Sequence, residues 1–103
     1  MEIHEPGDIA TALSAGMDTG GLLLDESQLG EKFFDLRSGL AGEVLQKFTN
    51  YRVRLAVVIE DANAYGARFS ELVYEHRAHP AVRFFNSAQH ARQWLTYNPI
   101  VKC

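Results

Sequence analysis

The chain reads RVRLAVVI over residues 52–59, and this stretch decides the fold. Every second side chain from Val53 to Ile59 is β-branched or leucine, so one face of an extended segment is continuously apolar. The pattern predicts a buried strand. Two acids, Glu60 and Asp61, follow directly, and the strand is expected to end there because acids are depleted in strands.

A helix and a second strand are predicted upstream of this strand. Apolar residues recur with a helical period from Leu36 to Phe48, which predicts the longest helix of the chain, ending at Asn50. Before it, the apolar run at residues 22–24 follows two glycines and ends at Asp25. A short apolar run between turn residues indicates a strand that is buried on both faces.

Shorter elements are predicted at the N-terminus. Residues 1–5 alternate apolar and polar side chains before a Pro-Gly pair, which predicts a short edge strand. Asp8 is expected to cap a short helix with one apolar face, and Gly16 is expected to end it.

The C-terminal half continues the alternation of helix and strand. Residues 69–76 show an amphipathic helical pattern, and the apolar run at residues 82–85 predicts a further strand. Ser87 is expected to cap a last helix, which Pro99 ends because the residue before a proline avoids helical backbone angles. Residues 99–103 are expected to form a loose tail.

Together these elements predict an α/β fold. Strands separated by helices of this length imply right-handed crossovers and a largely parallel sheet, here of about four strands in one layer with helices on both faces. The chain has 103 residues without a break in composition, which is enough for one hydrophobic core and too little for two. One domain spanning residues 1–103 is expected.

Composition excludes several classes of partner and cofactor. The net charge is −3 and the ten Lys and Arg residues are scattered, so nucleic acid is not expected as a partner. The longest apolar run, residues 55–59, is too short to span a membrane, and no export signal is recognised, so a cytoplasmic location is expected. The single cysteine, Cys103, allows no internal disulfide and no multi-thiolate metal site. No cofactor is expected.

One candidate site lies in the segment FDLRSGLAG, residues 34–42, which leads into the long helix. The Ser38 hydroxyl and nearby backbone N–H groups are expected at the positive end of this helix, where an oxyanion or phosphoryl group is favoured. A structural alternative is that Asp35 or Ser38 caps the helix. Gly39 and Gly42 would then allow close packing against the sheet.

A second candidate site is the edge of the sheet where the strands end. Ligands of open parallel sheets bind outside the carboxyl ends of the strands, which here carry Asp25, Glu60 and Asp61. Asp25 and Glu60 are candidates for paired acid–base carboxylates, although solvated acids commonly end strands. No nucleophile and base can be paired from their spacing, so no catalytic residue is assigned. The four histidines are too dispersed to predict a metal site.

A long segment resembles a known family. The run FFDLRSGLAGEVLQKF at residues 33–48, followed by NYRVRLA at residues 50–56, resembles the signature of the bacterial family called domain of unknown function 4180. The resemblance continues to Leu95 and covers the chain from about Gly20 onward. It departs from the family pattern at residues 59–61, where a Gly-Asp pair is usual. The resemblance implies a fold and a bacterial origin and carries no activity.

The layout is also similar to the sulfate-transporter and anti-sigma-factor-antagonist (STAS) domains. In those domains a strand, an Asp-Ser-Ser-Gly-like turn and a helix precede another strand. The serine of the turn can be phosphorylated to control partner binding, and the matching position here is Ser38, with Arg37 in place of the first serine. This resemblance implies a switch, because a phosphate at a helix N-terminus changes the surface that a partner meets.

Three function classes follow from these observations. The leading hypothesis is a non-enzymatic regulatory or protein-interaction module with a phospho-switch at Ser38. The alternative is a small-molecule or anion-binding domain that uses the helix N-terminus at Ser38 and Gly39 and the carboxyl edge of the sheet. An enzyme using Asp25, Asp35 or Glu60 is the third. A homo-oligomer is also compatible with an exposed edge strand at the N-terminus.

Overall fold

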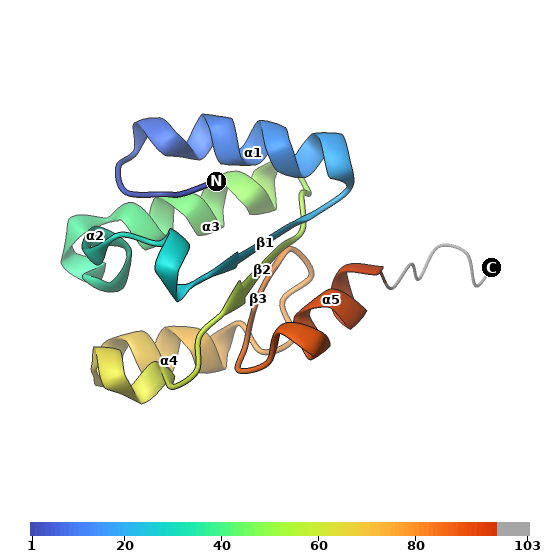
Figure 1. The fold of residues 1–103 in the computed structure, drawn as a ribbon. Coiled ribbons are helices and arrows are strands. Elements are labelled where there is room, and N and C mark those ends of the chain that lie inside the picture. Colours follow the sequence, from blue (N-terminus) through green and yellow to red (C-terminus); the bar gives the residue numbers. More distant parts are fainter. Residues whose placement is uncertain (97–103) are drawn as a thin grey trace.

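The computed structural model describes residues 1–96, and five α-helices and three strands lie in that part of the chain (Figure 1). In chain order they are α1 (Gly7–Thr19), β1 (Leu22–Asp25), α2 (Glu31–Phe34), α3 (Leu40–Asn50), β2 (Leu55–Val58), α4 (Ala67–Glu75), β3 (Val82–Phe85) and α5 (Ala88–Thr96). Three short 3₁₀ helices are η1 (Glu26–Gln28), η2 (Leu36–Ser38) and η3 (Ala62–Tyr65). The expected helix end at Pro99 and the expected tail lie outside the described residues.

The three strands form one parallel sheet in the order β1-β2-β3. The register aligns Leu24 with Val57 and Val57 with Phe84. The predicted parallel α/β sheet is confirmed, but the described residues contain three strands and not about four. The expected edge strand at residues 1–5 is wrong, because this segment makes only one isolated parallel bridge, from Ile3 to Leu29.

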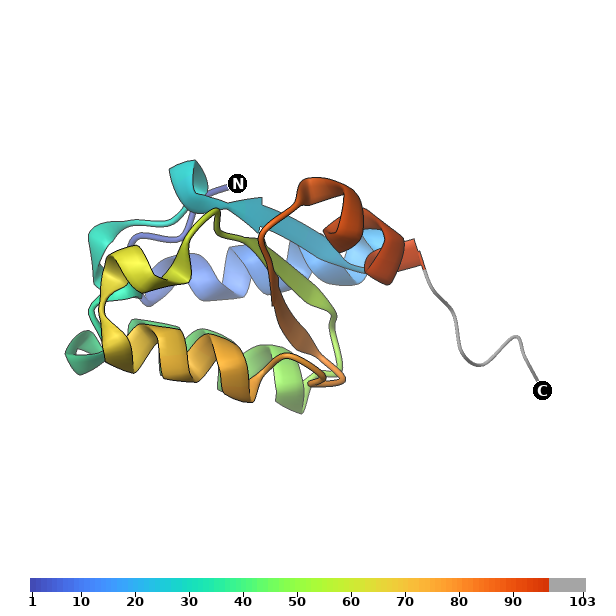
Figure 2. The same cartoon turned by 90° about the horizontal axis from the view of Figure 1, so that it is seen from below.

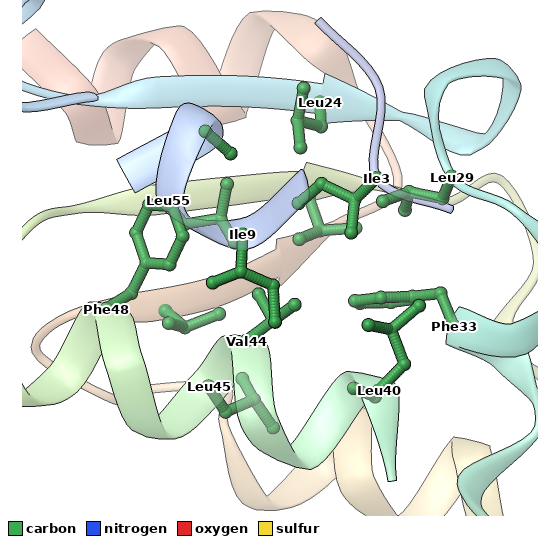
Figure 3. Close-up of a cluster of buried hydrophobic side chains, with 14 of the residues drawn as sticks. Ile3, Ile9, Leu24, Leu29, Phe33, Leu40, Val44, Leu45, Phe48 and Leu55 are labelled. Carbon is green, nitrogen blue, oxygen red and sulfur yellow. The ribbon is translucent and has the colours of Figure 1, made fainter. Parts of the chain in front are cut away.

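Helices cover both faces of the sheet, as predicted. Figure 2 shows α1, α3 and α4 on one side and α5 on the other. The face towards α1 and α3 holds the main core, to which β1 contributes Leu24 and β2 contributes Leu55 and Val57. Figure 3 shows Ile3 beside Leu29 in this core, so the N-terminal segment seals the end of the core and does not extend the sheet.

The first helix is longer than its sequence suggests. Helix α1 has 13 residues and α3 has 11, so the prediction that the helix ending at Asn50 is the longest is wrong. Gly16 lies inside α1 and is buried, and Gly20 ends the helix with a φ of 81°. A Cβ at Gly16 would lie 2.7 Å from Val53 Cγ1, so glycine permits the close approach of α1 to the segment just before β2. No helix in residues 1–96 is long and apolar enough to cross a membrane.

Asp8 does not cap α1 in the expected way. Pro6 occupies the N-cap position, and the Asp8 carboxylate instead accepts backbone N–H bonds from His4 (2.9 Å) and Glu5 (3.1 Å). These two hydrogen bonds stabilise the carboxylate and lower the pKa of Asp8. The residue therefore holds the loop before α1.

The C-terminal elements agree more closely with the predictions. Strand β3 covers residues 82–85, and Ser87 Oγ accepts a hydrogen bond from the N–H of His90 (3.4 Å) at the start of α5. Helix α5 buries Ala91, as expected, while Trp94 is only half-buried.

Candidate functional site

The predicted switch residues lie in η2, the turn between α2 and α3. The Asp35 carboxylate accepts hydrogen bonds from the backbone N–H (3.1 Å) and from Nε (3.2 Å) of Arg37. Ser38 Oγ donates to the backbone carbonyl of Lys32 (2.5 Å) and accepts from the N–H of Leu40 (3.2 Å). The hydroxyl of Ser38 therefore links α2 to the first residue of α3.

The expectation that Asp35 or Ser38 occupies the N-cap of the long helix is wrong, because Gly39 holds that position in α3. Asp35 caps η2, and Ser38 binds the first N–H group of α3. The expected packing role of the glycines is wrong, since a Cβ on Gly39 or Gly42 would meet no atom within 4 Å. Gly39 has a φ of 81°, a left-handed conformation that L side chains adopt only with strain. Glycine therefore serves the sharp turn between η2 and α3.

The acids at the carboxyl edge of the sheet have local structural roles. The Asp25 carboxylate accepts hydrogen bonds from the N–H (3.0 Å) and the hydroxyl (2.6 Å) of Ser27 and caps η1. The Asp61 carboxylate accepts from the N–H of Asn63 (3.0 Å) and caps η3. These three bonds are of the kind that sets turns at strand ends.

An open pocket of about 420 Å³ lies beyond the ends of β2 and β3 and is called the edge pocket here. Its lining residues are Ile59, Glu60, Asp61, Ala62, Val73, Phe84, Phe85 and Asn86. Glu60 and Asp61, which are consecutive in the chain, both line this pocket, whereas Asp25 does not. The lining contains two carboxylates and no cationic side chain, so its charge disfavours an anionic ligand.

The sequence analysis missed Glu26, which connects the two loops at this edge. Its Oε1 accepts a hydrogen bond from the N–H of Glu60 (2.8 Å), and its Oε2 accepts one from the Tyr65 hydroxyl. The hydrogen bond to Glu26, with smaller effects from burial and from the charge of Glu26, raises the pKa of Tyr65 to about 12. The two residues are 39 positions apart, so the sequence carried no signal for this bond beyond the general need of a tyrosine hydroxyl for a partner.

The ring of Tyr65 forms part of a second open pocket, of about 470 Å³, called the Tyr65 pocket here. It is lined by Phe34, Asp35, Leu36, Arg37, Tyr65, Gly66, Ala67, Arg68 and Phe69. Phe34 stacks on Tyr65 with ring centroids 3.9 Å apart and planes 12° apart. Asp35 and Arg37 therefore lie at this pocket, whereas Ser38 and Gly39 line neither pocket. The two pockets share no residue, so the two candidate sites remain separate.

A pair of histidines packs at the start of β3. The rings of His76 and His79 have centroids 4.9 Å apart, and Nδ1 of His79 accepts N–H bonds from Ala81 (3.0 Å) and Val82 (3.1 Å). Burial lowers the pKa of His79, with further effects from His76 and Arg83. Across residues 1–96 there is no group of three His, Cys, Asp or Glu residues that could hold a metal ion.

Comparison with known proteins assigns the family. The family model described as "Domain of unknown function (DUF4180)" matches residues 3–95. The match therefore includes α1, which the resemblance seen from about Gly20 onward did not cover. No curated protein and no solved structure matches the chain. Because the family model matches nearly the whole chain, the protein belongs to the DUF4180 family, a domain of unknown function.

Proposed function

We propose that the protein is a non-enzymatic regulatory module that binds a partner protein and is switched by phosphorylation of Ser38. The observation that carries the proposal is the placement of the Ser38 hydroxyl. It lies on an exposed residue, and its two hydrogen bonds hold the η2 turn between α2 and α3. Asp35 and Arg37 in the same turn line the Tyr65 pocket, so a change at Ser38 acts on a pocket wall.

Phosphorylation would remove one of these bonds. A kinase transfers the γ-phosphoryl group of ATP to Ser38 Oγ, ADP leaves, and the hydroxyl proton passes to a base of the kinase. The resulting ester oxygen has no proton, so it cannot donate to the carbonyl of Lys32. That carbonyl loses its side-chain partner, and the turn is free to rearrange.

The added charge would redirect Arg37. A phosphoserine carries roughly two negative charges, which the N-terminus of α3 and the guanidinium of Arg37 both attract. Asp35 already holds Arg37 through two hydrogen bonds and repels the phosphate. We expect Arg37 to exchange its carboxylate partner for the phosphate, which changes the charge presented at the Tyr65 pocket. The layout of strand, serine-containing turn, helix and strand, which resembles STAS domains, supports this mechanism by analogy.

The test is capture of the tagged protein from its own cells, with mass spectrometry for phosphate on Ser38, followed by repeat captures with Ser38→Ala and Ser38→Asp. A partner whose yield changes between the two variants supports the switch. Ser87→Asp is the matched control, because Ser87 also accepts a helix N–H bond but lies at the start of α5. A stability loss of about 1 kcal/mol in Ser38→Ala without any change in captured partner would leave Ser38 with a structural role only, as the link between α2 and α3.

Small-molecule or anion binding is the second candidate function. Such a ligand would use the helix start at Ser38 and Gly39 together with the carboxyl edge of the sheet. The acidic lining of the edge pocket disfavours an anion at that edge. The start of α3 remains available to an anion, since Ser38 and Gly39 are both exposed. Titration with inorganic phosphate, followed by amide NMR shifts, tests it: saturable shifts confined to Gly39 and Leu40 would favour the anion-binding function.

A further inference from the structure

We propose that the partner segment of this module is an acidic peptide with an aromatic side chain, and that it docks in the Tyr65 pocket against Arg37 and Arg68. The proposal rests on the proposed interaction function and specifies the chemistry of the partner.

The pocket offers a rigid aromatic floor. Phe69 is fully buried, and its ring lies 5.2 Å from that of Phe34 and 5.7 Å from that of Tyr65. The Tyr65 hydroxyl is bound to Glu26 on the side of the carboxyl edge, which fixes the orientation of the ring. A surface that is already ordered loses less conformational entropy when a partner binds. Aromatic partners gain additional energy from edge-to-face or offset contacts with such rings.

The charges around this floor favour an acidic partner. The lining contains two arginines and one carboxylate, although the whole chain has a net charge of −3. The Arg68 side chain is exposed and makes no hydrogen bond or ion pair within residues 1–96, although it lies in the same surface hollow as Glu71 and Glu75. Arg37 has Asp35 as its only ion-pair partner there, at 3.2 Å. An arginine without a carboxylate is available for bidentate binding by a Glu or Asp of the partner.

The shape of the pocket favours a peptide over a free metabolite. Small-molecule sites enclose most of the surface of their ligand. The Tyr65 pocket has about 470 Å³ and is open to solvent, so it can take one side chain while the remaining residues lie across its rim. Its Tyr and Arg lining is the composition that dominates binding energy at protein–protein interfaces.

The same geometry connects the docking site to the switch. Ser38 follows Arg37 in η2, so a phosphate on Ser38 competes with the acidic peptide for the Arg37 guanidinium. We therefore expect phosphorylation, or the Ser38→Asp change, to weaken docking.

The test uses the whole chain and three blocked, fluorescein-labelled pentapeptides, with binding measured by fluorescence anisotropy. Glu-Glu-Phe-Glu-Glu is the probe, Glu-Glu-Ala-Glu-Glu lacks the aromatic ring, and Lys-Lys-Phe-Lys-Lys reverses the charge. The probe is expected to bind about tenfold tighter than either control peptide, and Arg68→Glu to weaken its binding about tenfold, equivalent to about 1.4 kcal/mol. Arg92→Glu is the matched control, because Arg92 is an exposed arginine on α5 across the sheet, and it should leave the affinity unchanged.

Two patterns of failure are distinguishable. If the probe binds through Arg68 and Ser38→Asp does not weaken it, the docking site stands and the phospho-switch is wrong. If Ser38 variants change partner capture while the probe does not bind, or binds equally well after Arg68→Glu, the docking proposal is overturned and the switch stands. Thermal unfolding of Arg68→Glu should match that of the unsubstituted protein, because the exposed Arg68 side chain has no bond to lose within the described residues.

Discussion

The Tyr65 hydroxyl donates a hydrogen bond to the Glu26 carboxylate and so ties the turn after β2 to the turn after β1. The other oxygen of the same carboxylate accepts the N–H of Glu60 (2.8 Å). Strands β1 and β2 are neighbours in the sheet, so these two bonds fix the relative position of the loops at their carboxyl ends. The ring of Tyr65 stacks on Phe34, and the edge of the sheet thereby sets one wall of the Tyr65 pocket.

Removing the hydroxyl in Tyr65→Phe is expected to lower the free energy of unfolding by about 1–2 kcal/mol, because a hydrogen bond to a charged acceptor is lost while the ring remains. Urea denaturation measures this change. Tyr74→Phe is the control, because Tyr74 is 64% exposed and should change stability by less than about 0.5 kcal/mol. Equal losses in the two variants would contradict a specific role for the Glu26 bond.

Because of the hydrogen bond from Tyr65 to Glu26, the protein is expected to lose stability at alkaline pH. The pKa of Tyr65 is about 12 in the folded protein, against 10.0 for an ordinary tyrosine. Between these values the unfolded chain has released the phenolic proton while the folded chain still holds it, so the free energy of unfolding falls as pH rises. The stabilisation is complete below pH 10 and is lost towards pH 12. Urea denaturation between pH 10 and pH 12 should show that the free energy of unfolding declines less steeply in Tyr65→Phe than in the unsubstituted protein. Equal declines in the two proteins would show that Tyr65 is not the group responsible.

Strands β2 and β3 were predictable, because the local sequence pattern and the packing of the core agree in both. Strand β3 covers the predicted residues 82–85, and β2 lies within residues 52–59. The end of α1 was mispredicted at Gly16, since a glycine that ends a helix and one that permits close packing look the same in a sequence. Residues 1–5 carry a strand-like alternation, but only Ile3 among them is buried. The conformation of residues 1–5 is set by the packing of Ile3 in the core, which the local sequence does not show.

The candidate site was predictable only where its members are neighbours in sequence. Asp35, Arg37 and Ser38 share one turn, so their proximity followed from the sequence. The bond from Tyr65 to Glu26 joins two strand ends, and it required the register of β1 on β2. Because that register is set by the whole core, no local sequence motif predicts the Tyr65 pocket.

Two glycines that follow Ser38 in the chain, Gly39 and Gly42, should respond in opposite directions to the same substitution. Gly39→Ala is expected to destabilise the protein by about 1 kcal/mol, because the backbone there has a φ of 81°. Gly42→Ala is expected to stabilise it by up to about 1 kcal/mol, because Gly42 lies within α3 and a Cβ meets no atom within 4 Å. Chemical denaturation of both variants tests this, and a destabilised Gly42→Ala would show that packing, not helix propensity, governs that position.

The protein is expected to lose stability at acidic pH because of His79. Its Nδ1 accepts the N–H groups of Ala81 and Val82 at the start of β3, so the folded chain favours the neutral ring. Burial, with smaller effects from His76 and Arg83, lowers the pKa of His79 below the ordinary value of 6.5. Below pH 6.5 the unfolded chain therefore binds the proton more readily than the folded chain, and the free energy of unfolding falls as pH falls through the lowered pKa.

The stabilisation from the neutral His79 ring is complete above pH 6.5, so urea denaturation at about pH 7.5 and about pH 5 brackets its loss. Carboxylates also titrate in this range, and comparison with His79→Asn isolates the histidine. The asparagine carbonyl can accept the same N–H groups but carries no proton, so the variant should lose less stability on acidification than the unsubstituted protein. His90→Asn, at an exposed position of α5, should keep the original dependence. If His79→Asn leaves the pH dependence unchanged, the ring does not hold the start of β3 through its neutral form.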